Sequence, residues 1–348
     1  MENVEKLVYH TFFHKPSDID ELNFVNYCAL YQQMIDRTNP AYFDYGVPPI
    51  PAKECVALED AIKDATKVVK EKSQHKHIYL LWSGGIDSTV VLFAMLDAGI
   101  PFTVIMNENS VKEYPMVAKK ILAKEFSCDY FLYQDKMKPL KEVVPDFDNA
   151  WFVTGEIGDQ LSGSMITMRY TYEQRSMSMA EVIKQDLFTK PYEVKPEYVD
   201  GIPPLVVLKH GDYNTTELCV RYCEKPVYKF LGTDRETTTL SEFLWAVNFI
   251  YKYTLVILRL FKVGLWNAGS KENCTHFFDT VKFQQWAMDN YKSNCAYVKD
   301  ADYKMPFKEY IYRFTNDAEY RDEKEKVPSL KVAPYWSKDP MWNCRGKS

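Results

Sequence analysis

Two glycine-rich stretches combine small, hydroxyl-bearing and acidic residues in a pattern suited to phosphate chemistry. SGGIDS, residues 83–88, and TGEIGDQLSGS, residues 154–164, each follow an apolar run. Paired glycines such as Gly84 and Gly85 let backbone N–H groups approach an anion closely, and Ser83 and Ser88 add hydroxyl donors. The first stretch is therefore a candidate phosphate-binding loop, although it carries an aspartate, Asp87, and no lysine.

The spacing differs from the two commonest phosphate motifs. A Walker A loop needs G-x-x-x-x-G-K-[ST] and a dinucleotide fingerprint needs G-x-G-x-x-G, and the first stretch matches neither. An aspartate suits a phosphate site when it holds Mg²⁺, which binds carboxylates together with phosphate oxygens. The alternative interpretation of either stretch is a glycine turn whose acidic residues stabilise the N-terminus of the next helix.

Together the two stretches resemble the loops of the N-type ATP pyrophosphatases (PP-loop enzymes), which cleave ATP between the α and β phosphates. Asparagine synthetase-type ligases of this superfamily carry T/S-G-E-G-x-D-E-L-x-G-G where this chain reads T-G-E-I-G-D-Q-L-S-G-S. The family's second glycine is shifted by one position or replaced by Ile157, and Gln160 stands in place of its second acid. Glu156 and Asp159 match the family's first acid and its aspartate.

The resemblance implies a role for each matching residue. Asp87 and Asp159 would hold Mg²⁺, and Glu156 would act as an acid or base. The segment GLWNAGSKENCTHFFD, 264–279, resembles another family segment and adds Glu272 as a catalytic candidate. KEK at 324–326 stands where the family has R-x-K, which makes Lys326 the candidate catalytic lysine, with a solvated helix end as the alternative. The implied contacts to ATP and pyrophosphate are Ser83, Gly84, Gly85, Asp87, Ser88, Met106 and Gly155.

The implied activity is an ATP-dependent amide ligase that forms AMP and pyrophosphate, with ATP and Mg²⁺ as cofactors. It would adenylate a small carboxylate for attack by ammonia or an amine. Glutamine-dependent asparagine synthetases have Cys after the initiator Met, whereas position 2 here is Glu. A glutaminase domain is therefore not expected, and a separate glutaminase or carrier protein is a candidate partner. Two alternatives stay open: a PP-loop enzyme that modifies a nucleobase or tRNA, and a non-catalytic nucleotide-binding module.

The elements that must position these loops alternate between strand and helix. Strands are expected at 77–82, 101–106, 129–133 and 150–154, and helices at 57–72, 88–99 and 114–126. This alternation predicts βαβ units and a parallel sheet, whose ligands bind beyond the carboxyl ends of the strands. The expected fold is α/β, with an adenine nucleotide alpha hydrolase-like (PP-loop) core and a mostly helical C-terminal half. Helices of that half are predicted at 177–188, 241–262, 279–291 and 305–315.

The chain is expected to divide into four segments. They are an N-terminal arm or cap (1–54), the PP-loop core (55–165), a helical substrate or ligase region (166–328) and a C-terminal tail (329–348). The net charge of −5 offers no basic footprint, so a nucleic-acid partner is not expected.

The sequence also gives expectations for metal binding and for the cellular location of the protein. The 8 cysteines are scattered and favour buried thiols over a zinc site. The N-terminus does not have the layout of a signal peptide, which favours a cytoplasmic protein. The apolar stretch 243–261 contains Asn248, Lys252 and Arg259, which favours a core helix over a membrane span.

Overall fold

The computed structural model describes residues 37, 49–133, 140, 144–163, 167, 170–189, 215–221, 223–253, 256 and 273–324. The strands are β1 (His77–Leu81), β2 (Thr103–Met106), β3 (Asp129–Leu132), β4 (Ala150–Thr154) and β5 (Cys274–His276). The helices up to β4 are α3 (Leu58–Ser73), α4 (Ile86–Asp97), α5 (Glu108–Glu113), α6 (Pro115–Leu122) and the 3-10 turn η3 (Phe147–Asn149).

The helices after β4 form the second half of the described chain. They are α8 (Gly158–Leu161), α9 (Tyr172–Arg175), α10 (Met179–Lys184), η5 (Leu187–Thr189), α11 (Thr215–Arg221), α12 (Glu224–Leu231), α13 (Leu240–Val247), the π-helix η7 (Asn248–Lys252), α15 (Val281–Cys295), η8 (Asp300–Asp302), α16 (Met305–Thr315) and α17 (Ala318–Glu323). Of the predicted arm, Arg37 and residues 49–54 are described, and the predicted tail lies outside the described residues.

The strands form one sheet in the order β3-β2-β1-β4-β5, and every neighbouring pair is parallel. The predicted α/β class, parallel sheet and helical second half are confirmed. The sequence reasoning missed β5 because its three residues, Cys-Thr-His, contain no apolar run. Three residues suffice in the structure because β5 pairs along its whole length with β4.

The two faces of the sheet are covered differently, as the two-residue period of each strand requires. Ile78, Leu80, Val104 and Val153 face the main core, which also contains apolar residues of α3, α4 and α6. The alternate residues of the same strands, Tyr79, Ile105 and Phe152, belong to a smaller cluster on the other face. There they pack with Leu140 and Val144, which lie in the segment between β3 and β4. The strands β2 and β4 are therefore buried on both faces, as is general in parallel sheets, whereas the edge strand β3 is partly exposed.

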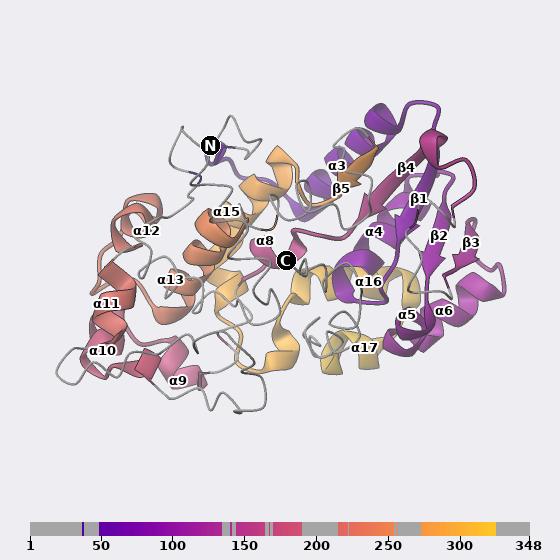
Figure 1. Ribbon diagram of the computed structural model, residues 1–348. Coiled ribbons are helices and arrows are strands. Elements are labelled where there is room, and N and C mark those ends of the chain that lie inside the picture. Colours follow the sequence, from indigo (N-terminus) through magenta and orange to yellow (C-terminus); the bar gives the residue numbers. More distant parts are fainter. Residues whose placement is uncertain are drawn as a thin grey trace, which may run out of the picture.

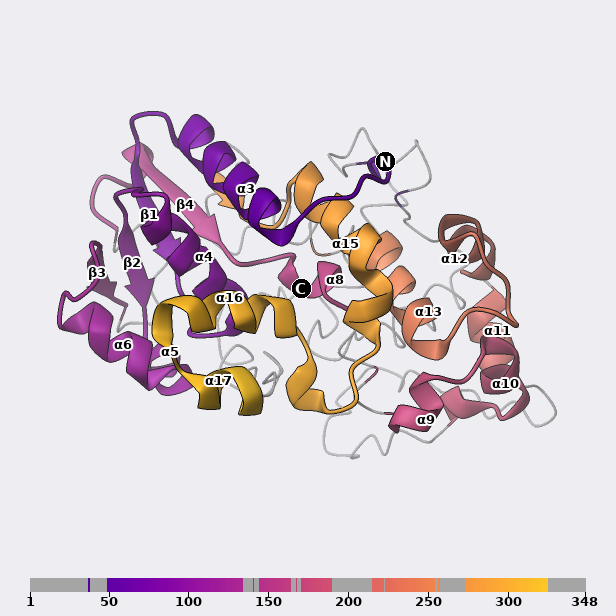
Figure 2. The same ribbon diagram turned by 180° about the vertical axis from the view of Figure 1, so that it is seen from behind.

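The sheet and the helices α9 to α13 lie at opposite ends of the molecule, and α8, α15 and α16 lie between them (Figure 1; Figure 2 shows the reverse side). The predicted helices at 279–291 and 305–315 correspond to α15 and α16, and 177–188 contains α10. The predicted helix at 241–262 begins as α13 and continues as the π-helix η7; its residues 257–262 lie outside the described residues. Within the described parts of the chain, no helix combines the length and apolar character needed to cross a bilayer.

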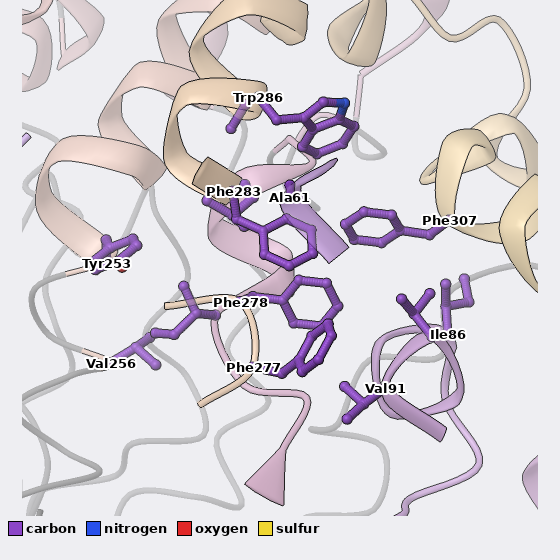
Figure 3. Close-up of a cluster of buried hydrophobic side chains, with 14 of the residues drawn as sticks. Ala61, Ile86, Val91, Tyr253, Val256, Phe277, Phe278, Phe283, Trp286 and Phe307 are labelled. Atoms are coloured by element: carbon purple, nitrogen blue, oxygen red, sulfur yellow. The ribbon is translucent and has the colours of Figure 1, made fainter. Parts of the chain in front are cut away.

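An aromatic cluster joins the sheet to the helical part (Figure 3). Phe277 and Phe278 directly follow β5, and Phe278 stacks on Phe307 of α16 with ring centroids 5.1 Å apart. Trp286 of α15 stacks on Phe307 with a centroid separation of 5.4 Å. Because stacked aromatic rings bury large apolar areas, this cluster fixes the start of α16 near α4 and the two glycine-rich loops.

Candidate active site at the carboxyl ends of β1 and β4

The two glycine-rich loops lie side by side because their strands are direct neighbours. The paired register of β1 and β4 ends at Leu81 and Thr154, so both loops leave the same edge of the sheet. A Cβ atom at Gly155 would lie 2.7 Å from the backbone nitrogen of Ser88, and one at Gly158 would lie 2.6 Å from the carboxyl carbon of Asp87. Both distances are too short for any side chain, so these glycines permit the close approach of the loops.

The first loop, residues 83–88, is closed by its own hydroxyl groups. The Ser88 hydroxyl accepts from the backbone N–H of Ser83, donates to the carbonyl of Gly85, and lies 3.0 Å from the Ser83 hydroxyl. Gly84 has φ +81°, and a Cβ there would lie 2.4 Å from the Ser110 carbonyl oxygen. Gly85 is the N-cap of α4, which places Asp87 in the first helical turn.

The second loop, residues 154–163, contains one residue with an uncommon backbone conformation, Ile157. Ile157 has φ +77° and is 1% exposed. A β-branched residue rarely adopts this conformation, which glycine adopts freely. The backbone at Ile157 therefore has a conformation that is typical of glycine. Asp159 follows in the first turn of α8.

The helical part of the molecule holds the second loop in place. The side-chain amide of Asn248, at the start of the π-helix η7, donates to the carbonyl oxygens of Asp159 and Gly163, both at 2.9 Å. The Trp245 indole donates to the carbonyl of Leu161 at 3.1 Å. These bonds come from outside the short helix α8, and π-helical turns often mark functional positions.

Lys304 joins the two loops. Its ammonium lies 2.5 Å from both carboxylate oxygens of Asp87 and 2.5 Å from Oδ1 of Asp159. The Lys304 side chain is 0% exposed, whereas those of Asp87 and Asp159 are 17% and 32% exposed, so the carboxylates reach the surface and the lysine approaches from beneath. Lys304 is the N-cap of α16 and has φ +61°, a conformation that is uncommon for lysine.

The carboxylates of Asp87 and Asp159 thus contact the same ammonium group, which marks a position where the structure stabilises a positive charge. The described residues contain no group of three His, Cys, Asp or Glu side chains able to hold a metal by themselves. Mg²⁺ in nucleotide sites commonly takes one or two carboxylates together with phosphate oxygens and water. Asp87 and Asp159 are two such carboxylates, and in this structure the Lys304 ammonium occupies the point between them.

Glu156 lies beside β5. Its backbone N–H donates to the hydroxyl of Thr154, which also hydrogen-bonds to Nδ1 of His276 at 2.7 Å. Burial raises the pKa of Cys274 to about 12, and the negative charge of Glu156 adds to this shift. The end of the segment 264–279 therefore lies against the second loop, although Glu272 itself lies outside the described residues.

The KEK run begins beside the first loop. The Lys324 ammonium lies 2.5 Å from the Glu113 carboxylate. Glu113 in turn packs against the first loop, since a Cβ added at Gly84 would lie 2.8 Å from the Glu113 Cβ. Lys326, two residues later, lies outside the described residues. The side chain of Met106 is 1% exposed in the main core, and a nucleotide contact from it stays a prediction.

Sequence reasoning missed Lys304, Asn248 and Tyr303, whose hydroxyl donates to the carbonyl of Gly163. Pro306 in the first turn of α16 is typical of a helix start, and it could have located the helix that follows Lys304. No sequence pattern indicates that this lysine reaches back to Asp87.

A parallel sheet in the order 3-2-1-4-5 with loops at its carboxyl edge defines an α/β protein consistent with a Rossmann-like core of the adenine nucleotide alpha hydrolase kind. Comparisons with protein-family models, with curated proteins and with solved structures find no match to this chain.

Proposed function

We propose that this protein is an ATP-dependent carbon–nitrogen ligase of the asparagine synthetase type, which releases AMP and pyrophosphate. It would adenylate a small carboxylate, and ammonia or an amine would then form the amide. The observation that supports this most strongly is the convergence of Asp87 and Asp159 on Lys304, between two glycine-rich loops at adjacent strand ends.

In the first half-reaction, a carboxylate oxygen of the substrate attacks the α-phosphorus of ATP. The bond from that phosphorus to the bridging oxygen breaks, and pyrophosphate leaves with the electron pair. Backbone N–H groups around Gly84 and Gly85 and the hydroxyls of Ser83 and Ser88 are the donors suited to the pyrophosphate. Bound between Asp87 and Asp159, Mg²⁺ would supply charge neutralisation for the phosphate oxygens.

In the second half-reaction, the amine attacks the acyl carbon and AMP leaves. The attacking nitrogen must lose a proton, and Glu156 is the candidate base because it lies in the second loop beside Asp159. Binding of Mg²⁺ between the two carboxylates would require the Lys304 ammonium to leave that position, and it would then supply positive charge to the phosphates. Lys326, Glu272 and a partner that delivers ammonia remain predictions of the family resemblance.

A second candidate is a nucleotide-binding module without catalysis, and one observation favours it. Lys304 already binds both carboxylates, so an internal cation occupies the point where a metal would be held. In addition, Ile157 and Gln160 stand where the resembled family has glycine and an acid. This candidate predicts ATP binding without release of AMP or pyrophosphate.

The deciding experiment incubates the protein with ATP, Mg²⁺, ammonium and pools of small carboxylic acids, and identifies the nucleotide products. The ligase predicts AMP and pyrophosphate, together with ATP–pyrophosphate exchange that depends on one acid. Asp159→Asn and Lys304→Ala should each reduce this exchange about a hundredfold or more, because each removes a charge next to the phosphates. Lys308→Met, a buried lysine that binds carbonyl oxygens instead, is the matched control.

Each other outcome points to a different function. ADP and phosphate as products would refute pyrophosphate release altogether. ATP binding without turnover, for every acid and for added tRNA, would favour the non-catalytic module. Turnover only with tRNA would favour the nucleobase-modifying alternative.

A further inference from the structure

A cavity lies away from the two loops, between α9, the start of α13 and the end of α15. Its volume is about 140 Å³, and its lining includes Tyr172, Arg175, Ser241, Glu242, Lys292 and Tyr297. At roughly 30 Å³ per water molecule, this volume accommodates a ligand of several non-hydrogen atoms. The lining contributes several hydrogen-bonding and charged groups to a small space.

Arg175 is a buried arginine with one nitrogen left over. It is 6% exposed; its Nε donates to the carbonyls of Thr167 and Tyr170, its Nη2 lies 2.6 Å from Asp300, and the guanidinium stacks over Tyr297 at 4.7 Å. Its Nη1 is buried and has no hydrogen-bond partner among the described residues. A buried guanidinium N–H without a partner is costly, so a ligand that accepts from it would be favoured.

Ser241 offers a second donor in the same cavity. It is 4% exposed, and its hydroxyl likewise lacks a partner within the described parts of the chain. The neighbouring hydroxyls are engaged: Ser176 donates to the Tyr172 carbonyl, and Thr239 donates to Glu242. Arg175 and Ser241 thus each bring to the lining of the same cavity a donor that has no hydrogen-bond partner in the described part of the chain.

The charges around the cavity select the kind of oxyanion. The charge of Arg175 is paired with Asp300, and the lining also contains the negative Glu242 and the exposed, positive Lys292. This near balance suits a singly charged group better than a doubly charged phosphate. Arginine and hydroxyl donors also match the two oxygens of a carboxylate.

We propose that this cavity binds the carboxylate of a small organic acid or amino acid. In an amino acid, the ammonium group would be directed to the Glu242 carboxylate. The inference does not depend on the proposed ligase activity, because it rests on the cavity's own donors and charges.

The cavity is also connected to Lys304. Asp300, the partner of Arg175, begins the turn η8, which leads directly into Tyr303 and Lys304. Tyr297, which stacks on Arg175, also contacts the Tyr303 ring with centroids 5.7 Å apart. A ligand on Arg175 would therefore brace the turn that carries Lys304.

The test titrates the full-length protein with sodium acetate, glycine and inorganic phosphate, using calorimetry and thermal unfolding at matched ionic strength with sodium chloride as the reference. Acetate or glycine should bind more tightly than phosphate. Ser241→Ala should weaken this binding about tenfold, because it removes one hydrogen bond to a charged group. Without ligand it should unfold at the same or a higher temperature, because the deleted hydroxyl has no partner to lose.

Two further variants keep the result interpretable. Arg175→Lys keeps the positive charge but loses Nη1, and it should weaken binding about tenfold or more. Ser176→Ala, whose hydroxyl already serves a local carbonyl, should bind like the unmodified protein. Absence of acetate and glycine binding at millimolar concentrations, tighter binding of phosphate, or binding unchanged by Ser241→Ala would each overturn the proposal.

Discussion

The two glycine-rich loops leave adjacent strands at the same edge of the sheet, yet they are held in different ways. The first loop closes on itself through Ser83 and Ser88, which are five residues apart. The second loop depends on Asn248, 89 residues from Asp159, and on the indole of Trp245. The first loop is therefore held by hydroxyl groups of its own residues, whereas the second loop combines internal hydrogen bonds with others from the helical part.

This difference predicts which substitutions should destabilise the two loops most. A loop held by its own hydroxyls loses little when one of them is removed, because its remaining groups stay close together. A loop held by distant side chains loses a donor to a buried carbonyl group when one of those side chains is removed. Lys304 belongs to neither loop and connects both, so its removal should have the largest effect.

Lys304→Ala should destabilise the protein by about 3 kcal/mol at neutral pH, since it leaves two carboxylates facing each other without their buried cation. The partial exposure of Asp87 and Asp159 places this at the lower end of the range for buried ion pairs. Millimolar Mg²⁺ should restore part of the loss, because the carboxylates still converge on one point. Urea unfolding with Mg²⁺ and with EDTA measures both effects.

The matched control is Lys308→Met. The ammonium of Lys308 donates to the carbonyls of Ala301 and Lys324, and burial lowers its pKa. Because this ammonium donates to carbonyl oxygens instead of joining two carboxylates, Mg²⁺ should restore less stability than in Lys304→Ala. An equal Mg²⁺ response in both variants would contradict the assignment of Asp87 and Asp159 as one cation site.

Asn248→Ala should cost about 2 kcal/mol, because the carbonyl groups of Asp159 and Gly163 each lose one donor, while Gly163 keeps the hydrogen bond from the Tyr303 hydroxyl. Hydrogen exchange should rise in residues 155–163 and stay unchanged in 83–88. Asn290→Ala is the control, since the Asn290 amide donates to one carbonyl of its own helix. Faster exchange in both loops would show that they are not held independently.

Gly158→Ala should cost about 2 kcal/mol by overpacking, because its Cβ would meet the carboxylate of Asp87 at 2.6 Å. It should also reduce ATP–pyrophosphate exchange, as it separates the loops. Gly85→Ala is the matched change in the first loop: φ there is −75°, and the nearest atom, Oγ of Ser83, is 3.3 Å from the new Cβ. Equal losses in the two variants would contradict the tight contact between the loops.

Alkaline pH should weaken the surroundings of the second loop through Cys274. Burial raises the pKa of Cys274 to about 12, above its ordinary value of 9.0. The folded state therefore keeps a proton that the unfolded chain loses, and this stabilisation is full below pH 9 and is lost as the pH rises toward 12. The loss is at most about 1.4 kcal/mol per pH unit. Unfolding free energies from pH 8 to 11 should fall less steeply for Cys274→Ala, and identical slopes would refute this role.

Ser88→Ala should have the smallest effect, about 1 kcal/mol by urea unfolding. The Ser83 hydroxyl still accepts from the Gly85 N–H, so the first loop keeps one of its internal bonds. A loss as large as that of Asn248→Ala would show that the first loop is no more self-sufficient than the second.

The predictions from sequence succeeded where the information is local. Alternating apolar strands and helices were recognisable because each pattern spans only a few residues, and both loops were located by their glycines. The strand β5 was not predicted, because its three residues show no strand pattern and it is a strand only through its pairing with β4 in the folded chain. The roles of Glu272 and Lys326 rest on the resemblance alone and stay predictions.

By itself, the sequence determined the order of strands and helices and the content of the two loops, since backbone preferences act over neighbouring residues. Only the tertiary structure decided which distant residues contact those loops. It brought Lys304 from 217 residues away to Asp87 and from 145 residues away to Asp159. It also assigned the glycine-like conformation to Ile157, which is 1% exposed and held by the packing around it. The physical reason is that a buried charge is specified by the partners that surround it, and those partners meet only in the folded chain.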